Sequence, residues 1–244
     1  MKSVFVIWKD IEDGMWHPVA KLTRINDGYR FNYTKGANHK NFIAFPRMND
    51  LAQVYHSTTL FSFFTNRLIP TNRPEFKKML SWSDIDPTAY DELDLLGISG
   101  GARKTDEFRI IPEPEVTNDS RYAIRFFISG VSHLGPENTK RVASLEDNEE
   151  LRLVYENSNA YDCNAVLIST KDEITVGYCP KYFNCDIRAL LEKPELTSYS
   201  LRVVKLNADA PAQYRVLCEF VTRWPNGFTP FVSEEYVAYS ASYI

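Results

Sequence analysis

The segment from Ile111 to Ser120 divides the chain into halves of different pattern, and this division most constrains the fold. It contains two prolines, three acidic residues and several turn formers. Proline removes backbone donors and stiffens the chain in an extended form, so the segment predicts a connection between domains. We therefore expect one domain at residues 1–115, a linker at 116–121 and a second domain at 122–244.

The first half has strands followed by helices. Short apolar runs predict strands at Val4–Trp8, Val19–Leu22 and Tyr29–Tyr33. A helix is expected at about 58–68, where apolar residues share one face. Two more are expected at 74–80, which has proline in its first turn, and at 87–97, which begins with proline and ends at glycine. The first half is thus expected to be an α+β domain.

The second half is mostly strand in pattern. Segments rich in β-branched and aromatic residues predict seven strands, at 122–131, 150–155, 165–169, 175–178, 199–206, 214–222 and 236–239. An amphipathic helix is expected at about Tyr182–Glu192. Short strands with one helix predict a mainly-β domain, either a small barrel or a sandwich.

Charge and apolar runs exclude several classes of protein. The chain has 28 basic and 32 acidic residues, a net charge of −4, which argues against a protein that coats duplex DNA by charge alone. Its longest apolar runs, such as Leu60–Phe64, are far shorter than a bilayer span. Asp10 and Glu12 follow the first apolar run, so we expect a strand rather than a signal peptide, and a cytoplasmic protein.

Cysteine and histidine spacing predicts neither a disulfide framework nor a metal site. The four cysteines all lie after residue 160 with no CxxC pair, so we expect reduced and mostly packed thiols. The four histidines are scattered along the sequence without a zinc-type spacing. No cofactor is expected either, because the sequence has no glycine fingerprint for a dinucleotide.

One polar loop and the strands around it carry the most informative pattern. Asn159-Ala-Tyr161-Asp162-Cys-Asn164-Ala165-Val166 leads into an apolar strand, and Gly177-Tyr178-Cys-Pro180-Lys181 precedes the predicted helix. Upstream, Phe126-Phe127-Ile-Ser-Gly130-Val-Ser-His133 ends the first strand of this half. Over about residues 122–235, this arrangement resembles the HIRAN domain, which occurs alone in bacteria and in eukaryotic DNA-repair translocases.

The resemblance implies an OB-like barrel that holds the 3′ end of single-stranded DNA. The matching residues are Asn159, Tyr161, Asp162, Tyr178 and Lys181. A carboxylate can accept a hydrogen bond from a 3′-hydroxyl and repels a 3′-phosphate, an amide can meet a base edge, and a lysine at a helix start can meet a phosphate.

Two departures from the family pattern bear on this function. Ala160 stands where the family has proline, and Ser132, His133 and Leu134 stand where DNA-binding members have a stacking aromatic pair. His133 can replace one stacking platform in part, and each platform is worth about 1–3 kcal/mol per base. An Asn/Asp-rich loop before a strand is also what a side-chain-capped turn needs, so both a binding and a structural role stay open for Asp162.

The first half resembles the N-terminal subdomain of HipA-type kinases. The matching residues are Leu60-Phe-Ser-Phe63-Phe64-Thr-Asn66-Arg67-Leu68-Ile69-Pro70 and the later Ile110-Ile111-Pro112-Glu113. In those kinases the subdomain packs on the catalytic body and helps to contact the antitoxin. The resemblance therefore implies a HipA-like kinase or another protein as partner, whereas Phe63 and Phe64 themselves are expected to be core residues.

The sequence contains no set of residues with a recognisable catalytic spacing. It lacks a kinase catalytic loop, a Gly-x-Ser-x-Gly turn and a helicase motif, and Gly97–Thr105 lacks the residues and context of a phosphate loop. We therefore expect a binding protein without enzymatic activity that recognises single-stranded DNA or its 3′-hydroxyl end. The alternative is a regulatory, antitoxin-like factor that binds a HipA-type kinase or a repressor.

Overall fold

The computed structural model describes residues 2–160, 162–194, 196 and 198–240. The chain is mostly β with few helices and divides into two compact units, each built from more than one segment. The first unit comprises Met1–Phe76, Ala89–Glu113 and Phe231–Ile244, and the second comprises Lys77–Thr88 and Pro114–Pro230. None of the described helices has the length and apolar character needed to cross a bilayer.

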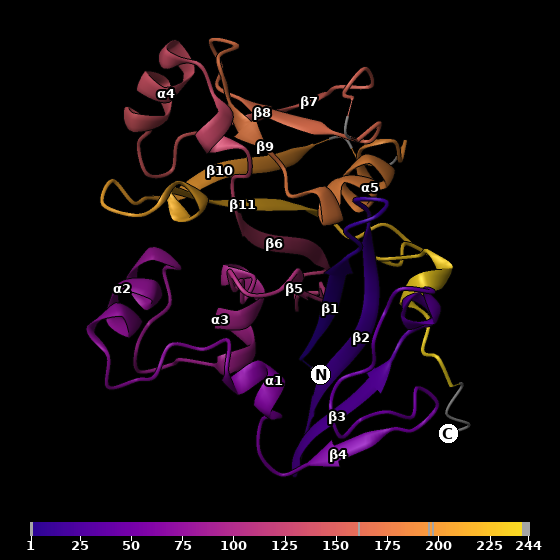
Figure 1. Ribbon diagram of the computed structural model, residues 1–244. Coiled ribbons are helices and arrows are strands. Elements are labelled where there is room, and N and C mark those ends of the chain that lie inside the picture. Colours follow the sequence, from indigo (N-terminus) through magenta and orange to yellow (C-terminus); the bar gives the residue numbers. More distant parts are fainter. Residues whose placement is uncertain (1, 161, 195, 197, 241–244) are drawn as a thin grey trace. The chain divides into compact units, whose positions relative to one another are not determined.

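The first unit contains a five-stranded antiparallel sheet in the order β4-β3-β2-β1-β5 (Figure 1). Its strands are β1 Ser3–Lys9, β2 Trp16–Ile25, β3 Gly28–Tyr33, β4 Tyr55–Ser57 and β5 Phe108–Pro112. Its helices are α1 Ser62–Thr65, α3 Glu92–Ser99 and the short 3₁₀ turns η1 Lys35–Asn38 and η4 Glu234–Tyr236. Helix α2, Pro74–Trp82, lies where the two units meet in the sequence.

An aromatic core holds the first unit together. Phe31 of β3 is fully buried, and its ring contacts those of Tyr33, Phe45 and Phe64 in edge-to-face arrangements. Edge-to-face rings add about 0.5–1.5 kcal/mol each beyond area burial. The expectation that Phe64 is a core residue is confirmed, while Phe63 is only partly buried and stacks under the Arg67 guanidinium.

Two helices of the first unit differ from the sequence prediction. The helix expected at 58–68 is a single turn, α1, because Phe61 is extended and the rings of Phe61, Phe63 and Phe64 pack against the sheet rather than along one helical face. Helix α3 begins at Asp91, whose side chain accepts from the N–H groups of Leu93 and Asp94, and not near Pro87.

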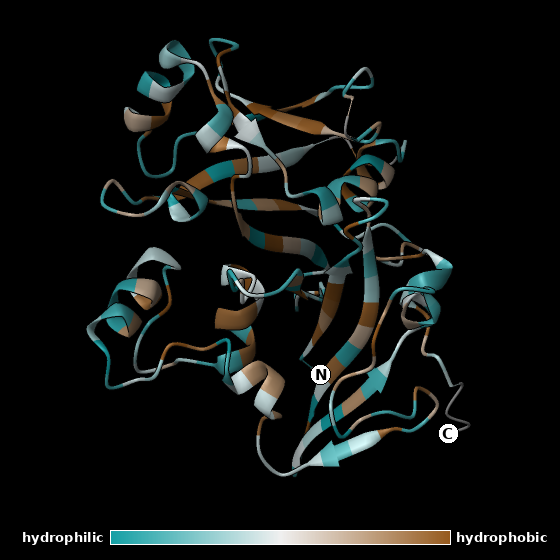
Figure 2. Ribbon diagram, viewed as in Figure 1, coloured by the Kyte–Doolittle hydropathy of each residue, from teal (hydrophilic) through white to brown (hydrophobic). Residues whose placement is uncertain are grey.

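The second unit consists of two three-stranded antiparallel sheets, in the orders β10-β11-β6 and β7-β8-β9. The strands are β6 Arg121–Phe127, β7 Arg152–Tyr155, β8 Val166–Ser169, β9 Thr175–Tyr178, β10 Tyr199–Leu206 and β11 Val216–Arg223. Helices α4 Pro136–Ala143 and α5 Lys181–Leu191 and the 3₁₀ turns η2 Val131–His133 and η3 Ala212–Tyr214 complete it. Figure 2 shows hydrophobic residues along β8, most of which are buried.

The expected OB-like barrel is present only as two sheets that meet at both edges. The isolated bridges Ser129↔Tyr178 and Glu150↔Arg202 join them, so the strand ladder is not continuous around the unit. The strand expected at 236–239 is wrong: Tyr236 ends the 3₁₀ turn η4, Ala238 makes only an isolated bridge to Thr34, and the segment belongs to the first unit. Helix α4 was not predicted from the sequence.

A glycine makes one of these edge contacts possible. Gly177 of β9 has φ +142°, and a Cβ atom there would lie 2.3 Å from Ile128 Cγ2 and 2.6 Å from the Ser129 carbonyl oxygen. Only glycine tolerates both the backbone conformation and this close approach. The Gly177-Tyr178 pair therefore places the end of β6 directly beside β9.

A row of ion pairs lies across the β10-β11-β6 sheet. Glu219 of β11 is opposite Arg202 of β10 and Arg125 of β6, and accepts hydrogen bonds from both at 2.8 and 3.0 Å. Burial acts to raise the pKa of Glu219, but the hydrogen bonds from Arg202 and Arg125 outweigh it and hold the pKa below its ordinary value.

Candidate nucleic-acid interface

The polar loop between β7 and β8 is closed by backbone hydrogen bonds between its own residues. The Glu156 N–H donates to the Ala165 carbonyl, the Asn159 N–H donates to the Glu156 carbonyl, and the Ala165 N–H donates to the Asp162 carbonyl. Asn and Asp side chains stabilise such turns by capping backbone N–H groups. The sequence thus builds a compact loop that leads directly into the buried start of β8.

Asp162 is held at the centre of this loop by two amides. Its Oδ1 atom accepts the Asn164 backbone N–H at 3.0 Å, and its Oδ2 atom accepts the Asn184 side-chain amide at 2.8 Å. The residue is half-buried, and each carboxylate oxygen retains a second lone pair. Asp162 therefore joins the loop to α5 and still presents acceptor capacity.

Glu156 links Asn159 to Tyr178. The Asn159 side-chain amide donates to Glu156 Oε2 at 2.6 Å, and the Asn159 Oδ1 atom accepts the Asp162 backbone N–H. Burial, with the neighbouring Glu156 carboxylate and its hydrogen bond, raises the pKa of Tyr178. These contacts bring Asn159, Asp162 and Tyr178 into one network.

The ends of β6 and α5 complete the surroundings of Tyr178. A Cβ atom at Gly130 would lie 2.9 Å from the Tyr178 ring, so the turn after β6 packs on this tyrosine. His133 lies three residues further along, exposed, in η2. Lys181 is the first residue of α5, one turn before Asn184, and is half-buried.

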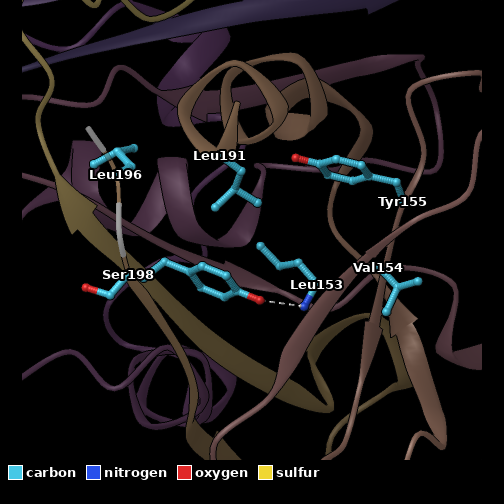
Figure 3. A pocket seen from close by; sticks show the side chains of 7 residues that line it. Leu153, Val154, Tyr155, Leu191, Leu196 and Ser198 are labelled. Atoms are coloured by element: carbon cyan, nitrogen blue, oxygen red, sulfur yellow. Dashed lines mark hydrogen bonds between the residues drawn. The ribbon is translucent and has the colours of Figure 1, made fainter. Parts of the chain in front are cut away.

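A hollow of about 480 Å³ lies in the same unit, at the opposite end of α5 from Lys181 (Figure 3). Its lining is mostly apolar and comprises Leu153, Val154, Tyr155, Leu191, Leu196, Ser198 and Tyr199. Tyr155 and Tyr199 are 37% and 36% exposed, which is unusual for large aromatic side chains. The Arg188 guanidinium lies 4.3 Å from the centre of the Tyr155 ring and donates to Asn157.

The structure thus gathers three of the six predicted site residues, Asn159, Asp162 and Tyr178, in one network. It places Lys181 at the start of the adjoining helix and His133 on the turn after β6, and Tyr161 lies outside the described residues. Sequence reasoning missed Glu156, Asn184, Tyr155, Tyr199 and Arg188. The aromatic ends of β7 and β10 are visible in the sequence, but only the fold shows that they share a hollow.

The cysteines differ in part from the expectation of packed thiols. All four are free, Cys179 and Cys218 are buried, and Cys163 and Cys185 are exposed. Burial raises the pKa of Cys179 and Cys218 well above the ordinary thiol value, so these two are unreactive core residues.

A comparison with protein families identifies the fold of the second half. The family model of the HIRAN domain matches residues 121–225. Residues 121–225 form a HIRAN domain. The match begins with β6 and ends two residues after β11, so it covers the polar loop, α5 and both sheets.

Two solved structures are similar to part of this chain. The HIRAN domain of human HLTF is 15% identical with a TM-score of 0.33, and the match covers 41% of this chain and 74% of that one. A protein from Lactobacillus plantarum is 17% identical with a TM-score of 0.34, covering 42% of this chain and 96% of that one. The search of curated proteins found no match.

Proposed function

We propose that the HIRAN domain of this chain binds single-stranded DNA at a 3′-hydroxyl end, and that the chain is a binding protein without enzymatic activity. The observation that carries the proposal is the position of Asp162. This half-buried carboxylate lies in a polar loop next to Asn159 and the start of α5, within the HIRAN-matched residues. A terminal hydroxyl donates to such an oxygen, and a terminal phosphate is repelled by it.

Asn159, Tyr178 and Lys181 supply the other contacts in this proposal. The Asn159 amide meets the terminal base or sugar, Lys181 meets the last internucleotide phosphate, and Tyr178 forms the wall between them. His133, exposed on the turn that packs on Tyr178, lies against the sugar or base from the other side. Tyr161 is part of the proposal through its place in the sequence pattern alone.

Tyr155 and Tyr199 take over the stacking role in this proposal. The family's aromatic pair is replaced by Ser132, His133 and Leu134, so bases need another platform. Tyr155 directly precedes the loop residue Glu156, and its ring already accepts the Arg188 guanidinium on one face. A base stacked in this hollow gains about 1–3 kcal/mol, and Arg188 lies close enough to meet its phosphate.

A titration of fluorescent oligonucleotides tests the proposal. We expect single strands that end in a 3′-hydroxyl to bind more tightly than 3′-phosphate or duplex forms. Two neutralised phosphates, at Lys181 and Arg188, predict a slope of log K against log salt of about −1.4, since a single strand contributes about −0.7 each. Equal affinity for all three forms would refute end recognition.

Matched lysine variants localise the contact. Lys181→Ala is expected to weaken binding of the hydroxyl-ended strand and to reduce the salt slope by about 0.7. Lys171→Ala removes a lysine from the exposed turn between β8 and β9 and is expected to leave both quantities unchanged. The same loss in both variants would mean that only net charge matters.

The second candidate function rests on the first half alone. The resemblance of residues 3–115 to the N-terminal subdomain of HipA-type kinases remains a prediction from the sequence, as does a kinase or repressor partner. We favour DNA-end binding because the candidate contacts all lie within the matched HIRAN residues.

A further inference from the structure

Two histidines and two aspartates meet beside the β1–β2 hairpin of the first unit. Asp10 follows β1, Asp13 lies in the hairpin turn, His17 is on β2, and His39 follows η1. The ligand atoms of Asp13, His17 and His39 all lie within 4.8 Å of one another. Asp10, Asp13 and His17 are close together in one hairpin, whereas His39 follows η1, so the sequence alone does not show that the four residues meet.

The distances within the group fit a metal ion better than hydrogen bonds. Asp13 Oδ2 lies 3.5 Å from His17 Nε2 and 3.6 Å from His39 Nε2. Both are at or beyond the limit of a useful hydrogen bond. A tetrahedral ion with bonds of about 2.0–2.1 Å holds its ligands about 3.4 Å apart, which is close to these separations.

The His17 ring is oriented with its Nε2 atom toward the group. Its Nδ1 atom is 2.9 Å from a carboxylate oxygen of Glu235, so Nδ1 carries the donated proton. Its Nε2 atom is buried and has no hydrogen-bond partner among the described residues. A carboxylate–histidine pair of this kind fixes the tautomer and raises the basicity of the ligating nitrogen.

Neighbouring residues hold the other members of the group. The Asp10 carboxylate is 4% exposed, accepts the Asn41 side-chain amide at 2.9 Å, and lies 3.6 Å from His39 Nε2. The Trp8 ring packs against His39 at 5.6 Å, and the two imidazoles lie 4.4 Å apart. The Asn41 N–H lies 3.4 Å from His39 Nδ1, a long contact that is given up when His39 binds through Nε2.

We propose that His17, His39 and Asp13 bind a divalent ion of the zinc type, with Asp10 beside the fourth position. Imidazole and carboxylate ligands suit zinc and its neighbours in the first transition row, whereas magnesium prefers an all-oxygen shell. A bound ion connects the hairpin turn, β2 and the segment after η1, and through Glu235 the segment near η4. The ion would thus stabilise the first unit by cross-linking these segments.

Metal binding to the tag-free full chain tests this proposal. After treatment with a chelator, equilibrium dialysis is expected to show one Zn²⁺ per chain and no Mg²⁺, with a raised melting temperature in zinc. Co²⁺ is expected to give the intense visible bands of four-coordinate nitrogen–oxygen ligation without the near-ultraviolet bands of thiolate. Cu²⁺ is expected to quench tryptophan emission, because Trp8 adjoins the site.

Variants assign the ligands. His17→Gln, His39→Gln and Asp13→Asn are each expected to weaken zinc binding at least 100-fold, and Glu235→Gln by about tenfold. His56→Gln, an exposed histidine on β4, serves as the matched control. Replacing the exposed Cys163 and Cys185 by serine is expected to leave the zinc affinity unchanged.

Three results would overturn the proposal: no zinc bound at micromolar concentration, unchanged affinity in the ligand variants, or loss of binding in the Cys163→Ser/Cys185→Ser variant. Unchanged far-ultraviolet dichroism of the metal-free variants establishes that they fold. Asp13 is exposed in the turn, so its variant tests the site even where a histidine variant misfolds. The readouts involve no DNA and are independent of the proposed function of the second unit.

Discussion

Replacing Asp162 by asparagine removes one negative charge and keeps most of the loop's hydrogen bonds. The Oδ1 atom that accepts the Asn164 N–H is retained. The Asn184 amide can turn over, because its Oδ1 atom is buried without a hydrogen-bond partner among the described residues and can accept from the new amide. We therefore expect Asp162→Asn to lower the free energy of unfolding by about 1 kcal/mol or less.

The same change has a larger effect on discrimination between DNA ends. In the proposed complex, a 3′-phosphate lies about 5 Å from the carboxylate, and Asp162 is half-buried. At an effective dielectric constant of about 40, two unit charges at this distance repel by about 1.7 kcal/mol. The preference for 3′-hydroxyl over 3′-phosphate strands is therefore expected to fall roughly 20-fold in Asp162→Asn.

Fluorescence anisotropy with paired oligonucleotides measures this preference, at low ionic strength and again near 0.15 M salt. Asp172→Asn removes an exposed carboxylate from the turn between β8 and β9 and serves as the charge control. An unchanged preference in a folded Asp162→Asn chain would assign Asp162 a purely structural role. Equal changes in both variants would reduce the effect to net charge.

Three further predictions concern stability, measured by denaturant unfolding of the full chain. Phe64→Ala is expected to destabilise the first unit by about 3–5 kcal/mol, because the ring is fully buried. Gly177→Ala is expected to cost about 2 kcal/mol or more, because its Cβ clashes with Ile128 and the Ser129 carbonyl. The pKa of Glu219 is lower in the folded than in the unfolded chain, so its ionised carboxylate stabilises the fold above the unfolded pKa, and this contribution is lost as the pH falls through the folded pKa. Glu219→Gln is therefore expected to reduce the decrease in the free energy of unfolding on acidification.

Controls separate these effects from general sensitivity to mutation. Gly227 has φ +71° but no atom within 4 Å of its added Cβ, so Gly227→Ala isolates backbone strain and is expected to cost less than Gly177→Ala. Glu150→Gln removes an exposed carboxylate and is expected to leave most of the acid dependence intact. An unchanged unfolding midpoint in Phe64→Ala would mean that the ring is not a core residue in solution.

Much of the β structure could be predicted from local sequence. β-branched and aromatic runs predicted β1, β6, β8, β9, β10 and β11, and the amphipathic segment after Pro180 predicted α5. These patterns are visible because each element buries a regular face of its own. The close approach at Gly177 also had a sequence signal, the Gly-Tyr pair, although its cause is contact with another strand.

The errors occurred where the local sequence allowed more than one structure. Asp86 and Asp91 are both plausible helix caps, yet Asp86 accepts from Thr88 in its own turn, and only Asp91 caps α3. The segment from Tyr236 to Tyr239 has strand-like residues, but Tyr236 ends the 3₁₀ turn η4 and packs its ring on Phe5 of β1. Neither choice can be made from propensity alone.

The candidate sites, too, could be predicted from local sequence only in part. The polar loop could be identified because Asn159 and Asp162 lie three residues apart in sequence, whereas the Asn184 amide that holds Asp162 lies 22 residues away on α5. The histidine–aspartate group of the first unit combines residues of one hairpin with His39, which follows η1, and the local spacing does not show that His39 joins them. Local spacing predicts a site only when one loop supplies most of it.

The charges around the polar loop bear on the proposed binding of single-stranded DNA. Two carboxylates, Glu156 and Asp162, lie within the network, and the cations nearby are Lys181 at one end of α5 and Arg188 towards the other. Opposite charges in similar number leave little net attraction for a polyanion, so long-range steering is weak. In the proposed complex, affinity therefore comes from short-range hydrogen bonds and from stacking on Tyr155 and Tyr199. Such a binding site is expected to be selective for the terminal group of the strand but to have modest overall affinity. The ratio of the affinities for 3′-hydroxyl and 3′-phosphate strands therefore tests the proposal more sharply than either affinity alone.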